Sequence, residues 1–230
     1  MAEKVTFPVD SYREAAVHLR RPFTGNAVRW KVQTGGGDAR GGFVVAYIDA
    51  RLVGERLNLV CPHLWSTQFE PWGGRIDTKQ VICYLTIDGL TRSDIGTGQG
   101  QDIAKAAYSD AFKRAAVHFG IGVSLYAMRA IWLPAGDGSL DGNTPTLKRV
   151  NYTTRDGRQR SRLELTPQAE NWLRETYARW LDSERGRKFG EPLDHGDELG
   201  SAGALIEGSD APAEDEAEAP SPELAAARQE

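Results

Sequence analysis

Cysteine and long apolar runs are scarce in this chain, and each scarcity excludes a class of protein. The only cysteines among its 230 residues, Cys61 and Cys83, fall in different expected elements and match no metal-ligand spacing. We therefore expect two reduced, partly buried thiols. No stretch approaches the roughly 18–20 apolar residues of a membrane helix. The start of the chain lacks the apolar core of a signal peptide, so a cytoplasmic protein is expected.

Groups that could support catalysis are also sparse. The four histidines are scattered, so no metal site is expected. The glycine-rich segment 96–100 has neither the Lys-Ser/Thr pair of a phosphate-binding loop nor dinucleotide-binding spacing, so we expect a flexible turn. A nuclease would need a carboxylate cluster, but Asp88 is explained by a turn and Asp102 by a helix start. Asp94 and Asp110 are too few, and we expect no enzyme, cofactor or metal.

Acidic and basic residues are unevenly distributed. The segment 190–230 carries 12 acidic residues and one basic residue, Arg228, which leaves 27 basic and 20 acidic residues before it. The body is therefore +7 and the tail −11. A basic body with an acidic tail is common among nucleic-acid-binding proteins, although it is not specific to them. The tail has too few large apolar residues to offset the entropy of ordering, so we expect it to be disordered.

Hydrophobic periodicity and turn residues predict an α+β fold. In chain order they predict a helix capped by Asp10 or Ser11, a hairpin (28–32 and 43–48), a helix (50–60), three strands (65–72, 79–87 and 90–95), a long helix (101–119), a second hairpin (147–153 and 160–165) and a helix from Thr166. Consecutive hairpins indicate an antiparallel β-sheet, formed by the first hairpin and the three-stranded meander, packed on the long helix. We divide the chain into a core (1–134), an accessory basic hairpin and helix (135–189) and a disordered acidic tail (190–230).

The long helix has two distinct faces when its residues are placed about 100° apart from Lys105. Three aromatic residues and three alanines fall in one arc, which should lie on the sheet: Tyr108, Phe112, Phe119, Ala104, Ala111 and Ala115. Charged residues occupy the remaining arc. Ile103 and Val117 interrupt that polar arc, which indicates a second contact, such as a neighbouring subunit. Pattern alone favours an ordinary amphipathic helix with a solvated face.

Two segments carry a more specific signal, SDIGTG at 93–98 and AAYSDAFKRAAVHFGIG at 106–122. They resemble the core signature of the Rad fifty-two superfamily of single-strand annealing proteins. The residues that match in register are Ser109, Asp110, Lys113, Arg114, Ala115, Phe119 and Gly120. The resemblance covers about Tyr12 to Leu133 and does not reach the second hairpin or the tail.

The resemblance implies an ATP-independent protein that binds single-stranded DNA and anneals it to its complement in homologous recombination or repair. It implies a homo-oligomeric ring. The short length, without a long eukaryotic-style tail domain, favours a phage-type protein that acts in the cytoplasm of a bacterial host. The family's Lys-Arg pair grips the DNA backbone in a groove, so Lys113 and Arg114 are the implied DNA-binding residues. Arg51 is the nearest match to another basic residue of the family. Some members carry a third cation on the helix, where this chain has Val117.

Further DNA contacts are expected from Lys105 on the polar arc of the helix and from the second hairpin. Six cations crowd the hairpin within fifteen positions, among them Lys148, Arg149 and Arg160. A solvated hairpin and a second surface for duplex or single-stranded DNA are nearly equal alternatives. The acidic tail is expected to compete with DNA or to recruit a companion exonuclease or single-strand-binding protein.

Three alternatives to annealing remain open from the sequence. The first is a protein of the same fold that protects DNA 3′ ends. The second is a metal-dependent nuclease that uses Asp94 or Asp110. The third is an RNA-binding adaptor.

Overall fold

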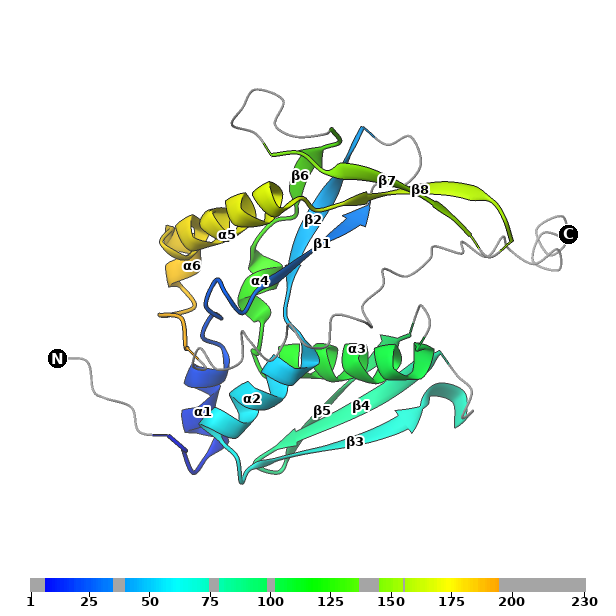
Figure 1. Cartoon of the computed structure of the whole chain (residues 1–230). Helices are drawn as coiled ribbons and strands as arrows, with labels where there is room; N and C mark the ends of the chain where they lie inside the picture. The colour runs from blue at the N-terminus through cyan, green and yellow to red at the C-terminus, as the bar shows by residue number, and fades with distance from the viewer. Residues whose placement is uncertain are drawn as a thin grey trace, which may run out of the picture.

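The computed structural model describes residues 7–34, 40–74, 79–98, 102–136, 145–154 and 156–194. Its elements in chain order are α1 (Tyr12–Leu19), β1 (Arg29–Thr34), β2 (Gly41–Tyr47), α2 (Ala50–Val60), β3 (Trp65–Pro71), η1 (Trp72–Gly74), β4 (Gln80–Ile87), β5 (Leu90–Thr97), α3 (Ile103–Val117), α4 (Val123–Ala127), β6 (Ile131–Pro134), β7 (Lys148–Thr153), β8 (Gln159–Glu164), α5 (Pro167–Leu181) and α6 (Glu184–Arg187) (Figure 1). The predicted α+β class is confirmed. Within these ranges no helix has the length and apolar character needed to cross a membrane.

The strands divide into separate sheets, which the sequence did not predict. The meander β3-β4-β5 packs against α3, as expected, whereas the first hairpin joins β6 in a second sheet of order β1-β2-β6. Strand β7 pairs with β8 alone. No element was predicted for the residues of β6; this strand pairs antiparallel with β2, from Gly41 opposite Pro134 to Val44 opposite Ile131. Figure 1 shows the two larger sheets in different layers, with α3 on the side of the meander that faces the second sheet.

The meander forms because one face of β4 is apolar and its turn suits a tight hairpin. Val81, Cys83, Leu85 and Ile87 alternate along β4 and are buried, as predicted. Asp88 and Gly89 have φ values of 51° and 75°. Both residues therefore have the positive φ of a type I′ turn, whose twist matches that of the flanking strands.

Helix α3 approaches β5 closely because glycine lies beneath it. A Cβ on Gly96 would overlap the backbone of Ala107 and Ala111, and a Cβ on Gly98 would overlap that of Ile103. Gly96 is therefore part of β5, not of a flexible turn. The buried stripe of α3 is Ala107, Ala111, Ala115 and Ala116.

Two residues predicted to be buried against the sheet are exposed instead. Ala104 is exposed, and Tyr108 is 43% exposed, with its ring against Phe69 of β3. Phe112 stacks on Trp65, so it lies at the edge of the sheet and is only half-buried. The backbone contact at Gly96 turns the helix so that alanines, which leave room for close approach, face the sheet.

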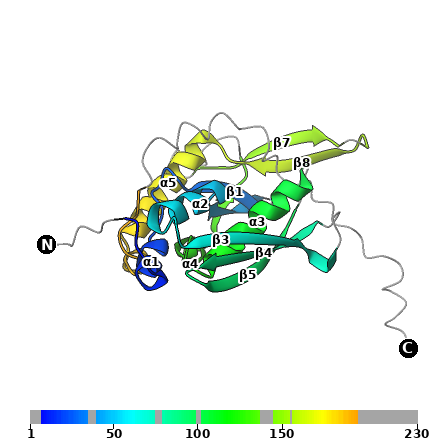
Figure 2. The same cartoon turned by 90° about the horizontal axis from the view of Figure 1, so that it is seen from below.

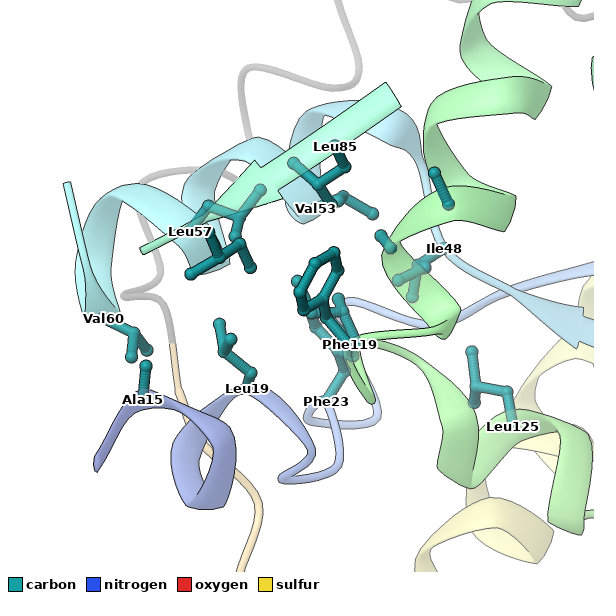
Figure 3. Packing of buried hydrophobic residues seen from close by; sticks show 14 of the residues in the cluster. Ala15, Leu19, Phe23, Ile48, Val53, Leu57, Val60, Leu85, Phe119 and Leu125 are labelled. Atoms are coloured by element: carbon teal, nitrogen blue, oxygen red, sulfur yellow. The ribbon is translucent and has the colours of Figure 1, made fainter. Parts of the chain in front are cut away.

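The main core lies where α1, α2 and the end of α3 meet the meander. Phe119 is 3% exposed and points between α2 and α1, close to Leu57, Val53 and Leu19 (Figure 3). Ser11 caps α1 by accepting from Glu14 N, whereas Asp49 at the start of α2 makes no side-chain cap bond. Cys61 and Cys83 are free thiols, and they are fully buried where partial burial was expected. Burial raises the pKa of Cys61 to about 11 and of Cys83 to about 12, which makes both thiols unreactive.

Arg56 of α2 is fully buried and holds the ends of several segments together. Its guanidinium donates to five backbone carbonyl oxygens, those of His18, Leu19, Arg21, Pro22 and Leu193. It also lies 4.1 Å from the centroid of the Phe23 ring. Burial lowers its pKa to about 9, so the side chain stays charged at neutral pH, and the carbonyl dipoles compensate that charge.

The accessory segment is built onto the core. Tyr177 of α5 is buried in the main core, and its hydroxyl donates to Phe23 O at 2.9 Å. A second core cluster, which includes Val44, Leu133 and Leu163, lies under α5. Residues 190–194, expected to belong to the tail, are hydrogen-bonded to the body: Arg21 donates to Glu191 O at 2.7 Å, and Leu193 N donates to Pro22 O at 3.0 Å. The expected tail beyond Asp194 lies outside the described residues.

Candidate nucleic-acid interface

Two lysines from different layers converge on one aromatic ring. Lys113 Nζ of α3 lies 5.7 Å from the centroid of the Tyr47 ring, and Lys31 Nζ of β1 lies 5.6 Å from the same centroid. Tyr47 ends β2 just before α2 begins. The ring therefore links the β1-β2-β6 sheet to α3, and it brings two cations together through cation–π contacts.

Lys31 was not singled out from the sequence, although a signal for it was present. Trp30 and Val32 alternate with Arg29 and Lys31 along β1, and they pack against the second core cluster. Arg29 and Lys31 must therefore share the opposite face. Arg29 lies opposite Tyr47 in the strand register, so the cations and the ring are on one face.

Arg114 is the most exposed member of a small ionic network. Its Nε donates to Asp94 Oδ1 at 3.1 Å, and His118 Nε2 lies 3.1 Å from Asp94 Oδ2. The side chain of Arg114 is 48% exposed and that of Asp94 is 24% exposed. Asp94 lies on β5, so the network orients the Arg114 side chain relative to the sheet.

The network fixes the charge of both partners. Burial raises the pKa of Asp94, but hydrogen bonds from Ile95 N and Arg114 outweigh burial, so the pKa lies below its ordinary value. Burial likewise works against the charged form of Arg114, and the hydrogen bond to Asp94 outweighs it, so that pKa is raised. Both groups are ionised at neutral pH, and a bound phosphate would compete with Asp94 for the guanidinium.

The carboxylates of the nuclease alternative are occupied by structural contacts. Asp94 is paired with Arg114, and Asp110 Oδ2 accepts from Thr97 N at 3.1 Å, which ties α3 to the end of β5. Asp88 accepts from Tyr12 N, and Asp102 caps α3 through Lys105 N. Across the described part of the chain, no three His, Cys, Asp or Glu side chains are grouped so that they could hold a metal ion.

The other predicted DNA-binding residues lie around this centre or on a separate element. Arg51 is exposed in the first turn of α2, four residues after Tyr47. Lys105 is exposed near the start of α3, about 12 Å along the helix from Lys113 at 1.5 Å per residue. Lys148, Arg149 and Arg160 lie on the β7–β8 hairpin (Figure 1). The structure thus joins Lys113 to Lys31 and places the hairpin cations on their own element.

The fold and this surface define a class of protein. An α+β domain presents cations from β1, α2 and α3, and the carboxylates of Asp94 and Asp102 near the α3 cations are used in an ion pair and a helix cap. Such a surface is suited to hold phosphates along a nucleic-acid backbone.

Comparison with known proteins identifies the family. The model of the Rad52/22 family of double-strand break repair proteins matches residues 12–136, more than half of the chain, and the chain therefore belongs to that family. The match ends before the β7–β8 hairpin. The described body beyond residue 136 is thus an addition to the part that the family model covers.

Two curated relatives are bacterial proteins named single-stranded DNA-binding protein DdrA. The chain is 41% identical over 130 residues to the one from Deinococcus deserti, which covers 55% of this chain and 64% of that protein. It is 40% identical over 116 residues to the one from Deinococcus radiodurans, covering 50% of this chain and 55% of that protein. The chain thus matches less than two thirds of either relative's length. No solved structure matches it.

Proposed function

We propose that this protein binds single-stranded DNA and anneals complementary strands, without ATP, in homologous recombination or DNA repair. The observation that carries the proposal is the convergence of Lys31 and Lys113 on the Tyr47 ring, with Arg114 next along α3. Membership of the Rad52/22 family and the names of the two relatives support it. Because annealing makes and breaks no covalent bond, a binding protein without a catalytic centre is sufficient.

The chemistry requires a grip on phosphates and open base edges. Arg114 can make two parallel hydrogen bonds to one phosphate, and the lysines supply point charges. Tyr47 is engaged with two ammonium groups, so its role is to place cations and not to stack on a base. Weak base stacking leaves the bases available to a second strand, which annealing needs.

A few cations bind weakly, and repetition of the site solves this problem. In a homo-oligomeric ring, sites on neighbouring subunits act along one strand, and the effective concentration of each next site is high. Ile103 and Val117 are partly buried on α3 and are the proposed subunit contacts. The phage-type origin and a companion exonuclease or single-strand-binding protein stay predictions.

The site is tested by replacing its cations and measuring binding and annealing together. Lys113→Ala with Arg114→Ala is expected to abolish binding of a labelled single strand and annealing of complementary oligonucleotides. Lys31→Ala is expected to weaken both, because it removes the second cation at Tyr47. The matched control, Arg174→Ala with Arg185→Ala, removes two exposed cations from α5 and α6 and should leave both activities intact. Unchanged affinity and salt dependence in the first variant would refute the site.

The same purified proteins distinguish annealing from the three alternative functions. A 3′-end protection protein would bind single strands through the same cations but would not accelerate annealing. A nuclease would cleave DNA in the presence of magnesium, and loss of that cleavage in Asp94→Asn or Asp110→Asn would favour it. An RNA-binding adaptor would prefer RNA over DNA of the same sequence in competition. We expect annealing, no cleavage and a preference for DNA.

A further inference from the structure

The β7–β8 hairpin is a two-sided ribbon whose faces differ. The strand register places Tyr152 opposite Arg160 and Val150 opposite Arg162, so these side chains share a face with Lys148 and Glu164. Leu163 lies on the opposite face and is buried in the second core cluster. The face with Lys148, Arg160 and Arg162 therefore points away from the core, and Lys148 and Arg160 on it are exposed. Arg149, which was also predicted to bind DNA, lies opposite Leu163 on the core-facing side.

The charge of the ribbon exceeds what its own acidic residues neutralise. Positions 148–164 contain six basic and two acidic residues, a net charge of +4. Both acidic residues pair within the hairpin: Glu164 Oε1 lies 2.6 Å from Arg162 Nη2, and Asp156 Oδ2 lies 3.1 Å from Arg158 Nε. The hairpin thus presents a concentrated positive field, which attracts a polyanion.

The shape of the ribbon selects the kind of polyanion. Figures 1 and 2 both show β7 and β8 reaching beyond the helices and the larger sheets, so the outer part of the ribbon can enter a groove. Two paired strands lie about 5 Å apart, and the major groove of B-form DNA, about 12 Å wide, admits such a ribbon. The major groove of double-stranded RNA is deep and narrow and does not.

The aromatic residue on the ribbon does not indicate a single-strand site. Single strands bind on rings that present an open face to the bases. The guanidinium of Arg162 lies 5.6 Å from the centroid of the Tyr152 ring, over the ring. Tyr152 therefore supports a cation instead of presenting a face to a base. Polar side chains on the other face, Asn151, Thr153 and Gln159, are exposed and suited to hydrogen bonds with groove edges.

We propose that the β7–β8 hairpin is a second DNA-binding site, which takes duplex DNA by its phosphates in the major groove. This site is separate in sequence from the Rad52/22 match at 12–136 and from the surface around Tyr47. It requires neither annealing activity nor the first site. A protein with both sites holds a single strand and a duplex at once, so that it can retain the duplex that annealing produces.

The test compares DNA forms with a charge-removal pair on the ribbon. Lys148→Gln with Arg160→Gln removes two exposed cations from the outward face, and Arg174→Gln with Arg185→Gln is the matched control. Full-length proteins are titrated into a labelled blunt duplex, a single strand and a double-stranded RNA by fluorescence anisotropy. Each phosphate contact with B-DNA contributes about 0.9 to the slope of log affinity against log salt, so the pair should lower the duplex slope by about 1.8.

The slope change gives a fold-change that can be measured directly. Between about 50 and 200 mM salt, the wild type should lose about tenfold more duplex affinity than the variant, because a slope difference of about 1.8 acts over a fourfold range. Single-strand affinity should stay within about twofold of the wild type, and double-stranded RNA should bind more weakly than duplex DNA.

Three results would overturn the proposal. The first is that Lys148→Gln with Arg160→Gln binds duplex DNA with the affinity and salt slope of the wild type, as the control variant is expected to do. The second is an equal loss for duplex and single strand, which would make the hairpin part of one general surface. The third is tighter binding of double-stranded RNA than of duplex DNA. The variant Lys113→Ala with Arg114→Ala distinguishes a failure of this proposal from a failure of the proposed function, because it should lose single-strand binding and retain duplex binding.

Discussion

Replacing Arg56 with methionine tests how the corner between α1, α2 and residues 190–194 is stabilised. Methionine fills most of the volume of the arginine stem but donates no hydrogen bond. The five carbonyl oxygens bound by the guanidinium would all lose that donor. The change is therefore a loss of hydrogen bonds with little loss of packing.

The expected loss of stability depends on how many of the five carbonyl oxygens keep another hydrogen-bond donor. His18 O still accepts from Arg21 N, and Pro22 O still accepts from Leu193 N. Among the described residues, the carbonyls of Leu19, Arg21 and Leu193 have no such second donor, and an unsatisfied buried group costs about 1–3 kcal/mol. Relief from burying a charge offsets part of the sum, so we expect a loss of about 3–5 kcal/mol in the free energy of unfolding. For a body of this size, that lowers Tm by roughly 6–20 °C.

The assay is urea unfolding followed by tryptophan fluorescence, together with a thermal melt. Arg56→Lys keeps the charge but has a compact donor group, so it should recover only part of the loss. Arg174→Met removes an exposed arginine from α5 and should change the free energy by less than about 0.5 kcal/mol. A loss below about 1 kcal/mol for Arg56→Met would refute the reasoning, because it would mean that the carbonyls are satisfied without Arg56.

Four further predictions concern packing, pH and charge. Gly96→Ala should cost about 3 kcal/mol or more in a urea melt, because its Cβ overlaps the α3 backbone, whereas Gly25→Ala, with open space, should not. Burial and the nearby arginines lower the folded-state pKa of His18, so stability is full above its ordinary value of 6.5 and falls as pH drops below it; His18→Gln should flatten that loss in melts between pH 7 and 5. Asp94→Asn frees Arg114 for phosphate and should steepen the single-strand salt slope by about 0.7; a shallower slope would show that Asp94 positions Arg114 instead. Deleting 195–230 should raise single-strand affinity at low salt if the acidic tail competes with DNA, and unchanged affinity would argue for recruitment or solubility.

Local signals in the sequence predicted most of the elements but not how the sheets divide. The Asp88-Gly89 turn, the alternation along β4 and the bounds of α2 follow from nearest neighbours in the chain, and the structure confirms them. Strand β6 depends on β2, which lies about ninety positions earlier. A four-residue strand that ends in proline carries no periodicity of its own, so only its partner reveals it.

Only part of the candidate site could be predicted, because local patterns identify single residues but not contacts between distant elements. Lys113 and Arg114 were found because they belong to a recognisable motif. Lys31 was missed, although its alternation with Trp30 and Val32 placed it on an outward face. No local pattern in the sequence predicts that Lys31 and Lys113 meet at Tyr47. Their contact with one ring depends on how the β1-β2-β6 sheet lies against α3.

The burial of both cysteines makes the natural chain ready for site-directed labelling. Cys61 and Cys83 have no exposed surface, and their raised pKa values leave almost no thiolate at neutral pH. A maleimide dye reacts with thiolate, so it would not label Cys61 or Cys83. A single cysteine introduced at an exposed position of the ribbon or of α3 would therefore carry the only dye. Energy transfer from each position to a labelled strand could then show which DNA lies where, in a protein whose core is unaltered.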